Sequence, residues 1–243
     1  MTLTVANKTS FLSHFLSPIS RLSNSCSINI GDDEISTIIA AADNTAILYA
    51  RYKSDIGTSG SKINLPDLSR LVKILKCIDK DAFELEHNRN SIKYRDSNIQ
   101  FTYHLLEDGI LNSPSISVEK IGNLTFNTKF KVSYSSMINL IKSSTFAINL
   151  NKLYIYTKDG NVYAEINDKQ AHNVDSVSIK LCNGFYGDEI ADPLPISFET
   201  IRTVVGSKCD MLTINVNTKL NVMTFDINNV ESRLTYIISG LIK

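Results

Sequence analysis

Four basic side chains spaced along one short stretch are the residues of this sequence best suited to do chemistry. The stretch reads "PDLSRLVKILKCIDK" (66–80), and its cations are Arg70, Lys73, Lys76 and Lys80. At about 100° per residue, they lie opposite an apolar stripe made of Leu68, Leu71, Val72, Leu75 and Ile78. Positive side chains on an exposed helix face bind phosphate groups by charge, without reading bases. A solvated lysine face, the usual fate of exposed helix positions, is the alternative.

No pattern in the sequence predicts catalysis, so we do not expect an enzyme. Gly57–Lys62, "GTSGSK", lacks the spacing of a phosphate-binding loop, and Asp32–Glu34 is typical of an exposed turn. No GxSxG or HExxH motif occurs, and the isolated histidines are His14, His87, His104 and His172. We expect buried free thiols, with neither disulfides nor a zinc site, because no CxxC pair exists among Cys26, Cys77, Cys182 and Cys209.

The composition is typical of a globular, intracellular protein. The chain has 25 basic and 25 acidic residues, so its formal net charge is zero, and 43% of its residues are hydrophobic. No apolar run approaches the roughly 20 residues that span a bilayer, and the N-terminus lacks the pattern of a signal peptide. We therefore expect an intracellular location and no membrane partner.

Periodicity along the first half predicts a helix, four strands, a second helix and three further strands. The first helix covers 7–21, where Pro18 must distort or end the last turn. Pro66 fits a first helical position and Asp67 the first turn, so we expect the second helix at 66–80. The predicted strands are Cys26–Ile30, Ile35–Ala41, Ala46–Tyr52, Lys62–Asn64, Ala82–Glu86, Ser91–Arg95 and Ile99–Leu105.

The second half repeats this order of elements. Its helices are expected at 133–145 and 197–208, and Asp159-Gly160 suits a type I′ turn between two strands. Its predicted strands are Leu153–Thr157, Val162–Ile166, Val174–Leu181, Leu194–Ser197, Met211–Val216, Leu220–Ile227 and Arg233–Ser239. A repeat with a period of roughly 130 residues indicates a duplicated α+β domain. We place the first domain at 1–106, a turn-rich connector at 107–127 and the second domain at 128–243.

The predicted helices carry a positive charge that the chain as a whole does not. Their windows hold nine basic and three acidic residues, a net charge of +6, so the rest of the chain sums to −6. The basic residues are Lys8, Arg21, Arg70, Lys73, Lys76, Lys80, Lys142, Arg202 and Lys208. Helices that shared one surface would give this neutral protein a cationic face, and the polyanion that fits such a face is nucleic acid. We therefore predict that these side chains bind double-stranded DNA without sequence specificity.

The segment "INLPDLSRLVKILKCIDKDAFELE" (63–86) resembles a strand–helix–strand segment of DNA sliding clamps, the family of proliferating cell nuclear antigen. The order of elements is similar over the whole chain, and the C-terminal "SRLTYIISGLIK" looks most like clamps of T4-type bacteriophages. The resemblance implies a homotrimer: a ring of six similar domains, with helices on the inner face and antiparallel sheets outside. Such a ring encircles duplex DNA as a processivity factor, tethers a DNA polymerase, and is opened by a separate ATP-dependent clamp loader. It needs no cofactor of its own, and a bacteriophage clamp would act in the host cytoplasm.

The resemblance also implies two protein-binding sites. Edge strands of neighbouring subunits would pair through Ile99, Phe101 and Tyr103 of one copy and Val177, Ile179 and Leu181 of the next. A groove for partner peptides would use Ala42, Ala46, Ile110, Leu111, Ile116, Ile237 and Ser239. Internal strand pairing and ordinary core packing are the alternatives for these two sets.

Two other functions fit some of these observations. A monomeric processivity factor of the same fold, as in some herpesviruses, would hold DNA on its basic helices by charge alone. A β-rich virion or assembly protein would show duplication and edge pairing, although it would not need cationic helices. The mass in solution separates a ring from the monomeric factor.

Overall fold

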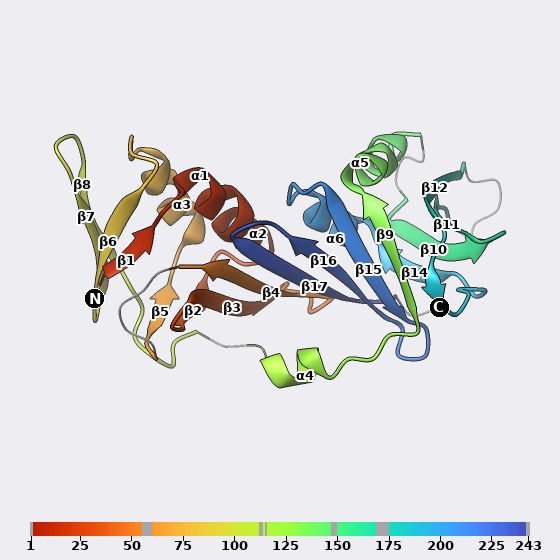
Figure 1. Ribbon diagram of the computed structural model, residues 1–243, viewed down its shortest axis with the longest axis horizontal. Coiled ribbons are helices and arrows are strands. Elements are labelled where there is room, and N and C mark those ends of the chain that lie inside the picture. Colours follow the sequence, from red (N-terminus) through yellow and green to blue (C-terminus); the bar gives the residue numbers. More distant parts are fainter. Residues whose placement is uncertain are drawn as a thin grey trace. The chain divides into compact units, whose positions relative to one another are not determined.

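The protein folds into two compact units, seen in its computed structural model (Figure 1). The structure describes residues 2–54, 60–111, 114, 116–146, 150–168 and 175–241. Unit 1 contains residues 1–119 together with 229–234, and unit 2 contains residues 120–228 and 235–243. His172, the first half of the 57–62 stretch and the start of the strand predicted from Val174 lie outside the described residues.

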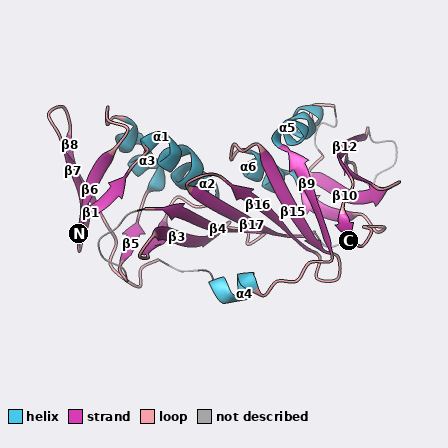
Figure 2. Ribbon diagram, in the orientation of Figure 1, coloured by secondary structure: helices cyan, strands magenta, loops and turns pink. Residues whose placement is uncertain are grey.

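Unit 1 combines helices with two sets of antiparallel strands (Figure 2). Its helical segments are α1 (Lys8–Phe11), a π-helical turn (Leu12–Leu16), α2 (Ser17–Leu22), α3 (Leu68–Lys76) and, in the predicted connector, the first two residues of α4 (Val118–Gly122), whose last three residues belong to unit 2. Its strands are β1 (Thr2–Val5), β2 (Cys26–Ile30), β3 (Glu34–Ala40), β4 (Ala46–Lys53), β5 (Lys62–Leu65), β6 (Phe83–Asn88), β7 (Ser91–Arg95) and β8 (Gln100–His104). They follow the orders β1-β6-β7-β8 and β4-β3-β2-β5.

Pro18 widens the first helical segment without ending it. Proline has no N–H to donate, and the turn before it is a π turn, in which the Ser17 N–H donates to the carbonyl oxygen of Leu12. Pro18 then occupies the first turn of α2, where Pro18 and the residue after it, Ile19, are both buried. The expected distortion is confirmed, and the helix continues to Leu22.

The basic helix α3 begins two residues later than predicted. Asp67 is extended (φ −148°) and its carboxylate accepts the N–H of Arg70 at 2.9 Å, so it is the N-cap and not a residue of the first turn. The side-chain oxygen of Asn24 accepts the N–H of Ser69 at 3.0 Å and satisfies a second free donor of the helix. The apolar stripe is confirmed, since all five members are buried: Leu68, Leu71, Val72, Leu75 and, just beyond the helix, Ile78.

Unit 2 repeats this arrangement. Its helices are α5 (Tyr134–Ser143) and α6 (Phe198–Val205). Its strands are β9 (Thr128–Ser133), β10 (Lys152–Lys158), β11 (Asn161–Ile166), β12 (Val177–Asn183), β13 (Tyr186–Gly187), β14 (Leu194–Ser197), β15 (Met211–Asn217), β16 (Val222–Asn228) and β17 (Ser232–Ser239), whose first residues belong to unit 1. They follow the orders β12-β11-β10-β14 and β13-β9-β15-β16-β17. The turn between β10 and β11 has φ +51° at Asp159 and +72° at Gly160, as the predicted type I′ geometry requires.

Matching strand orders confirm the predicted duplicated α+β fold. Apart from the two-residue β13, the order β9-β15-β16-β17 corresponds to β1-β6-β7-β8, and β12-β11-β10-β14 corresponds to β4-β3-β2-β5. The prediction missed the first strand of each half, although "TLTV" in β1 and "TKFKVS" in β9 both alternate between buried and more exposed positions. The strands that were predicted are all present, with bounds shifted by at most three residues.

Large apolar side chains fill both units. Phe15, Leu48 and Leu68 are fully buried in unit 1, and Phe130, Phe198, Phe225 and Tyr236 are fully buried in unit 2. Each such side chain contributes roughly 1.5–3 kcal/mol relative to an exposed one. The hydroxyl of Tyr236 lies 2.7 Å from Ser207 Oγ, so its burial leaves no polar group unsatisfied.

We expect Gly187→Ala to destabilise unit 2 strongly. Gly187 has φ +92°, and an added Cβ would lie 2.0 Å from the carbonyl oxygen of Asn127. A left-handed backbone costs about 1–2 kcal/mol for alanine and overpacking about 1–3 kcal/mol, so the free energy of unfolding should fall by several kcal/mol. Urea unfolding followed by circular dichroism measures this loss.

Two other glycines supply matched controls. Gly160→Ala has the same backbone strain (φ +72°) but no described atom within 4 Å of the added Cβ, so it should cost about 1 kcal/mol. Gly122→Ala has neither problem and should leave stability unchanged or slightly higher. Equal losses of unfolding free energy in Gly187→Ala and Gly160→Ala would show that the close approach to the Asn127 carbonyl oxygen adds no destabilisation.

Candidate nucleic-acid interface

The helices that carry the basic residues lie together within each unit. In unit 1, α2 packs against both α3 and the strands, and in unit 2 α5 packs against α6 (Figure 2). With α1 and the π turn, these described helices hold seven basic residues and one acidic residue, Glu199, a net charge of +6. The basic residues are Lys8, Arg21, Arg70, Lys73, Lys76, Lys142 and Arg202. The helical charge is therefore the same with the observed helix bounds, although Lys80 and Lys208 lie beyond the ends of α3 and α6.

Helix α3 carries the densest part of this charge. Arg70, Lys73 and Lys76 are exposed, and none of them is ion-paired with an acidic residue in the part of the chain that the structure describes. Lys80 is also exposed, in the loop that follows the helix. The Arg70 N–H that the Asp67 carboxylate accepts lowers the pKa of this carboxyl. Exposed cations without partners are free to bind phosphate.

Lys8 and Arg202 both have partners within the protein. The half-buried Lys8 donates a hydrogen bond from its ammonium to the carbonyl oxygen of Ile78. Arg202 is paired with Glu199 at 3.3 Å, and its guanidinium lies 4.7 Å from the centre of the Phe198 ring. Lys8 is therefore a packing residue, and Glu199 offsets the charge of Arg202. The remaining predicted cations, Arg21, Lys142 and Lys208, are exposed.

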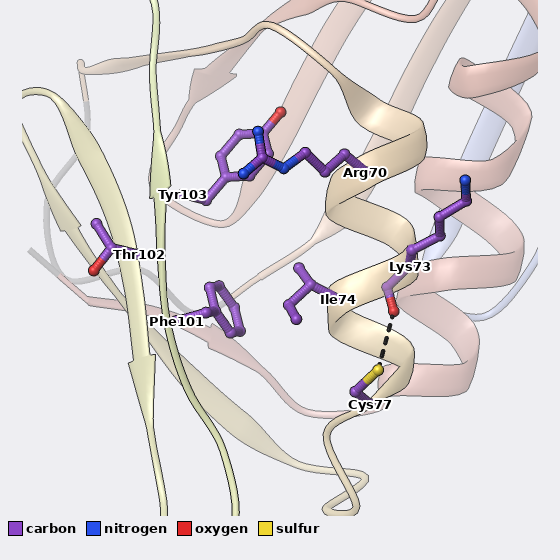
Figure 3. Close-up of a pocket in the computed structure, with 7 residues that line it drawn as sticks. All are labelled: Arg70, Lys73, Ile74, Cys77, Phe101, Thr102 and Tyr103. Carbon is purple, nitrogen blue, oxygen red and sulfur yellow. Dashed lines mark hydrogen bonds between the residues drawn. The ribbon is translucent and has the colours of Figure 1, made fainter.

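A small apolar pocket lies between α3 and the edge strand β8 (Figure 3). Its volume is about 320 Å³, and Ile74 of α3 faces Phe101 of β8 across it. Arg70 extends toward Tyr103 at one end of the pocket, whereas the ammonium of Lys73 points away from Phe101 (Figure 3). The cations of α3 thus divide between an apolar pocket beside a sheet edge and the open helix surface.

Both strands predicted to pair between subunits are edge strands. β8 ends the order β1-β6-β7-β8, and β12 ends the order β12-β11-β10-β14. Among the predicted interface side chains, the half-buried ones are Ile99, Phe101, Val177 and Ile179, and the buried ones are Tyr103 and Leu181. The hydroxyl of Tyr103 donates to the carbonyl oxygen of Asp67 at 2.7 Å, which ties the edge strand to the start of α3. Among the described strands, neither edge has an internal partner on its outer side.

A hollow of about 700 Å³, which we term the connector groove, lies along the start of the connector in unit 1. Three predicted groove residues line it: Ala42, Ile110 and Leu111. Ile38, Ala40 and Pro114 also line it, and the prediction missed them. Ile38 and Ala40 occupy positions of β3 that alternate with its buried residues, where a solvent-facing strand normally has polar side chains. That exception to the alternation was the available signal.

The other predicted groove residues are placed elsewhere. Ala46 is 2% exposed and occupies an inward position of β4, which fits core packing, the alternative for this residue. Ile237 is 7% exposed, although it alternates with the inward residues of β17 and so lies on the same face of the strand as Ser239. Ile116 is half-buried and Ser239 is exposed, and neither lines the connector groove.

The four cysteines are free, but they are not all buried. Burial raises the pKa of Cys26 to about 12, and burial with the nearby charge of Asp210 raises that of Cys209 to about 11. Cys182 is half-buried, and burial raises its pKa as well. Cys77 is exposed, contrary to the prediction, because it caps the C-terminus of α3 on the solvent side.

The described ranges contain few other groups of chemical interest. Within them, no three His, Cys, Asp or Glu side chains come close enough together to hold a metal ion. No helix in those ranges is long and apolar enough to cross a membrane. In the acidic turn Asp32–Glu34, the first two residues are exposed and the third is half-buried.

Comparisons with known proteins identify the fold. No family model and no curated protein matches the sequence. Proliferating cell nuclear antigen (PCNA) from Entamoeba histolytica is similar in structure with a TM-score of 0.79 at 12% identity, over 99% of this chain and 98% of that one. The PCNA of A. fulgidus, solved with the C-terminal region of FEN-1 bound, gives 0.79 at 15% identity, over 99% of both chains. The PCNA2–PCNA3 complex from Sulfolobus tokodaii gives 0.73 at 12%, again over 99% of both chains. The chain has the two-domain fold of PCNA-type clamps, which confirms the predicted fold class.

We expect the double variant Lys73→Glu with Lys76→Glu to weaken binding to duplex DNA and to reduce its salt dependence. Each lost phosphate contact should lower the slope of log K against log salt by about 1. Fluorescence anisotropy with a labelled duplex, measured from low to moderate salt, gives both quantities.

The control is Lys93→Glu with Lys158→Glu, two exposed cations on strands β7 and β10. This pair changes the net charge by the same amount and should leave the salt dependence close to that of the parent protein. Equal losses in the two double variants would show that only total charge matters, and not the position of the cations on α3.

Proposed function

We propose that this protein is a DNA sliding clamp, a ring of three copies that encircles duplex DNA and tethers a DNA polymerase. The observation that carries the proposal is a PCNA-type fold, matched over 99% of the chain, whose helices hold a net charge of +6 in a neutral protein. Three copies would bring a net charge of +18, three times +6, to the helices. The role is mechanical, and it uses no catalytic residue.

Electrostatic contacts suit this task because they are weak and exchange rapidly. Exposed side chains such as Lys73, Lys76 and Lys142 can pass from one phosphate to the next without reading bases. A closed ring does not need high affinity, since it stays on the duplex by topology. A polymerase bound to the ring is then held at a high effective concentration near its template.

A hydrogen-bonded contact within unit 1 supports the proposed pairing between copies. Within unit 1, the Lys53 N–H at the end of β4 donates to the carbonyl oxygen of Glu231 at 2.8 Å, and the Tyr52 hydroxyl donates to the Glu231 carboxylate at 3.1 Å. Glu231 leads into β17, which is the counterpart of β8, and β4 is the counterpart of β12. Pairing of β8 with the β12 of a second copy would repeat this junction between copies. Such head-to-tail contacts close into a ring when the rotation permits.

The connector groove is the proposed site for an apolar segment of a partner protein. Its lining by Ile38, Ala42 and Leu111 favours small apolar anchors. The A. fulgidus PCNA, which has the same fold, was solved with the C-terminal region of FEN-1 bound. By analogy, the polymerase and an ATP-dependent clamp loader are the partners that we propose for this groove. A relationship to clamps of T4-type bacteriophages, acting in the host cytoplasm, stays a prediction from the C-terminal sequence.

A monomeric processivity factor is the second candidate, because exposed cations on helices would serve a protein that holds DNA by charge alone. The two functions differ in what the sheet edges do. In a ring, β8 and β12 are paired between copies, whereas in a monomer they stay open.

We expect a mass near 81 kDa, three times 27.1 kDa, by sedimentation equilibrium at micromolar concentration. Ile179→Glu places a charge on the half-buried flank of β12, so it should shift the mass toward 27.1 kDa. Tyr186→Glu, at an apolar side chain that is 78% exposed on β13, is the control and should leave the trimer intact. A parent protein of 27.1 kDa would favour the monomeric factor.

Trapping on DNA tests encirclement in the same variants. At high concentration a ring threads onto the free ends of a linear duplex, and streptavidin added to biotin at both ends retains it through a salt wash. A restriction cut between the blocks should then release it. If the protein were retained equally with and without the end blocks, and before and after the cut, it would be held on the DNA by charge alone, which would contradict the ring.

We expect Cys77 to be the fastest-reacting thiol of the free chain and to become protected on assembly. Its thiol is exposed beside the edge strand β8, whereas the raised pKa of Cys26 and Cys209 lowers their thiolate fraction at pH 8. Reaction with a chromogenic disulfide should therefore be fast in dilute, monomeric protein and at least several-fold slower in the trimer. Cys77→Ser should remove the fast phase, and a rate that does not change with assembly would place β8 outside the interface.

A further inference from the structure

Asn64 is a buried polar residue at the junction of β2, β5 and the start of the connector, and it is 7% exposed. Its Oδ1 accepts a hydrogen bond from the Ser27 hydroxyl at 2.6 Å. Its Nδ2 donates to the Asp108 carboxylate at 2.8 Å and to the carbonyl oxygen of Leu106 at 3.4 Å. The backbone carbonyl of Asn64 accepts the Leu106 N–H at 3.0 Å. One residue therefore joins two strands to the segment that follows β8.

This network requires the chemistry of an amide side chain. Oδ1 accepts while Nδ2 donates, so neither a carboxylate nor an apolar side chain of the same size can replace both functions. Because the amide is buried, leaving one of its hydrogen-bonding groups unsatisfied would cost more free energy than an exposed hydrogen bond contributes. The network therefore holds the backbone at 106–108 in a defined place.

Two hollows flank the segment that follows. One is the connector groove, and the other is a polar hollow of about 1180 Å³ whose lining includes Lys62, Asn64 and Asp108. Ser27 and Leu111 line both hollows. The chain at Leu111 is therefore a wall shared by the two, and the network at Asn64 holds the residues that lead into this wall.

We propose that Asn64 is a positioning residue for the connector groove: its amide holds residues 106–108 against β2 and β5 and so sets the place of Ile110 and Leu111 in the groove wall. The inference rests on the proposed function only in taking this groove as the site of a partner segment. A wall that is held before binding reduces the conformational entropy that binding must remove, so the partner finds a preformed surface.

The separation of the groove walls tests this role without any partner. Nitroxide labels at Ala42→Cys and Ile110→Cys, two exposed residues that line the groove, report their distance by pulsed electron paramagnetic resonance. The background carries Ser at Cys77, Cys182 and Cys209 and retains the buried Cys26. We expect Asn64→Asp to give a roughly twofold broader distance distribution than the parent, because its carboxylate would face that of Asp108. Hydrogen exchange at the Leu106 amide should be on the order of tenfold faster.

Two further variants separate positioning from a general loss of stability. Asn64→Asp combined with Asp108→Asn restores a donor opposite an acceptor between positions 64 and 108 at unchanged net charge, although not the longer bond to the Leu106 carbonyl oxygen, so it should return both measurements most of the way to the parent values. Asn29→Asp adds the same charge at an exposed position of β2 and should change neither measurement. If Asn64→Asp does not fold, Asp108→Ala removes only the exposed partner of the amide and should give the same changes at smaller size.

Faster exchange at Leu106 with an unchanged wall distance would overturn the proposal, because the network would then hold a strand end and not the groove. Failure of the exchanged pair to restore the distance would overturn it as well. None of these measurements uses DNA or assembly. A monomeric mass would therefore refute the ring and leave this result in place, and the reverse also holds.

Discussion

Backbone hydrogen bonding at the sheet edges is the constraint on which the proposed assembly depends. A strand that ends a sheet presents a row of N–H and C=O groups that must find partners in water or in another chain. The structure leaves β8 in this position at the end of one set of strands in unit 1, and β12 at the end of the other, non-corresponding set in unit 2. At the end of β4, the counterpart of β12, the Lys53 N–H already finds its partner in Glu231, within unit 1. Duplication thus leaves each chain with one open edge of each kind, and two complementary edges per copy are what a head-to-tail ring uses.

Small side chains give the connector groove its room. Ala40 and Ala42 stand on one wall, where larger residues would fill the space, and Ile110 and Leu111 stand on the other. The second wall belongs to a segment outside the strands, so its position depends on polar contacts made behind it. In this fold, the shape of the connector groove is therefore set by a buried amide that does not itself line it.

The sequence alone predicted the elements whose residues alternate or repeat clearly. The stripe of α3 from Leu68 to Leu75 and the duplicated order of strands are set by local periodicity, so both were predictable. The cap at Asp67 could not be separated from a first-turn residue, since both positions favour an acidic side chain. The first strands of the two halves were missed because each is completed by a distant partner: β1 pairs with β6, and β9 with β15.

The candidate sites were less predictable than the fold. Charge counting found the cations of α3, but it could not show that the ammonium of Lys8 donates a hydrogen bond to the carbonyl oxygen of Ile78, which is 70 residues away in the sequence. The same holds for Asn64, whose partners come from residues 27, 106 and 108. Long-range hydrogen bonds of this kind depend on tertiary contacts, and no periodicity in the sequence records them.

Segregation of charge in a neutral chain also determines what the protein does when it is far from its target. Beyond the Debye length, about 10 Å at 0.1 M salt, the basic helices and the acidic remainder cancel, so a free molecule exerts almost no pull on distant polyanions. Attraction begins only when a phosphate backbone comes within reach of the helix surface itself. A protein with this charge distribution therefore attracts a polyanion only at close range.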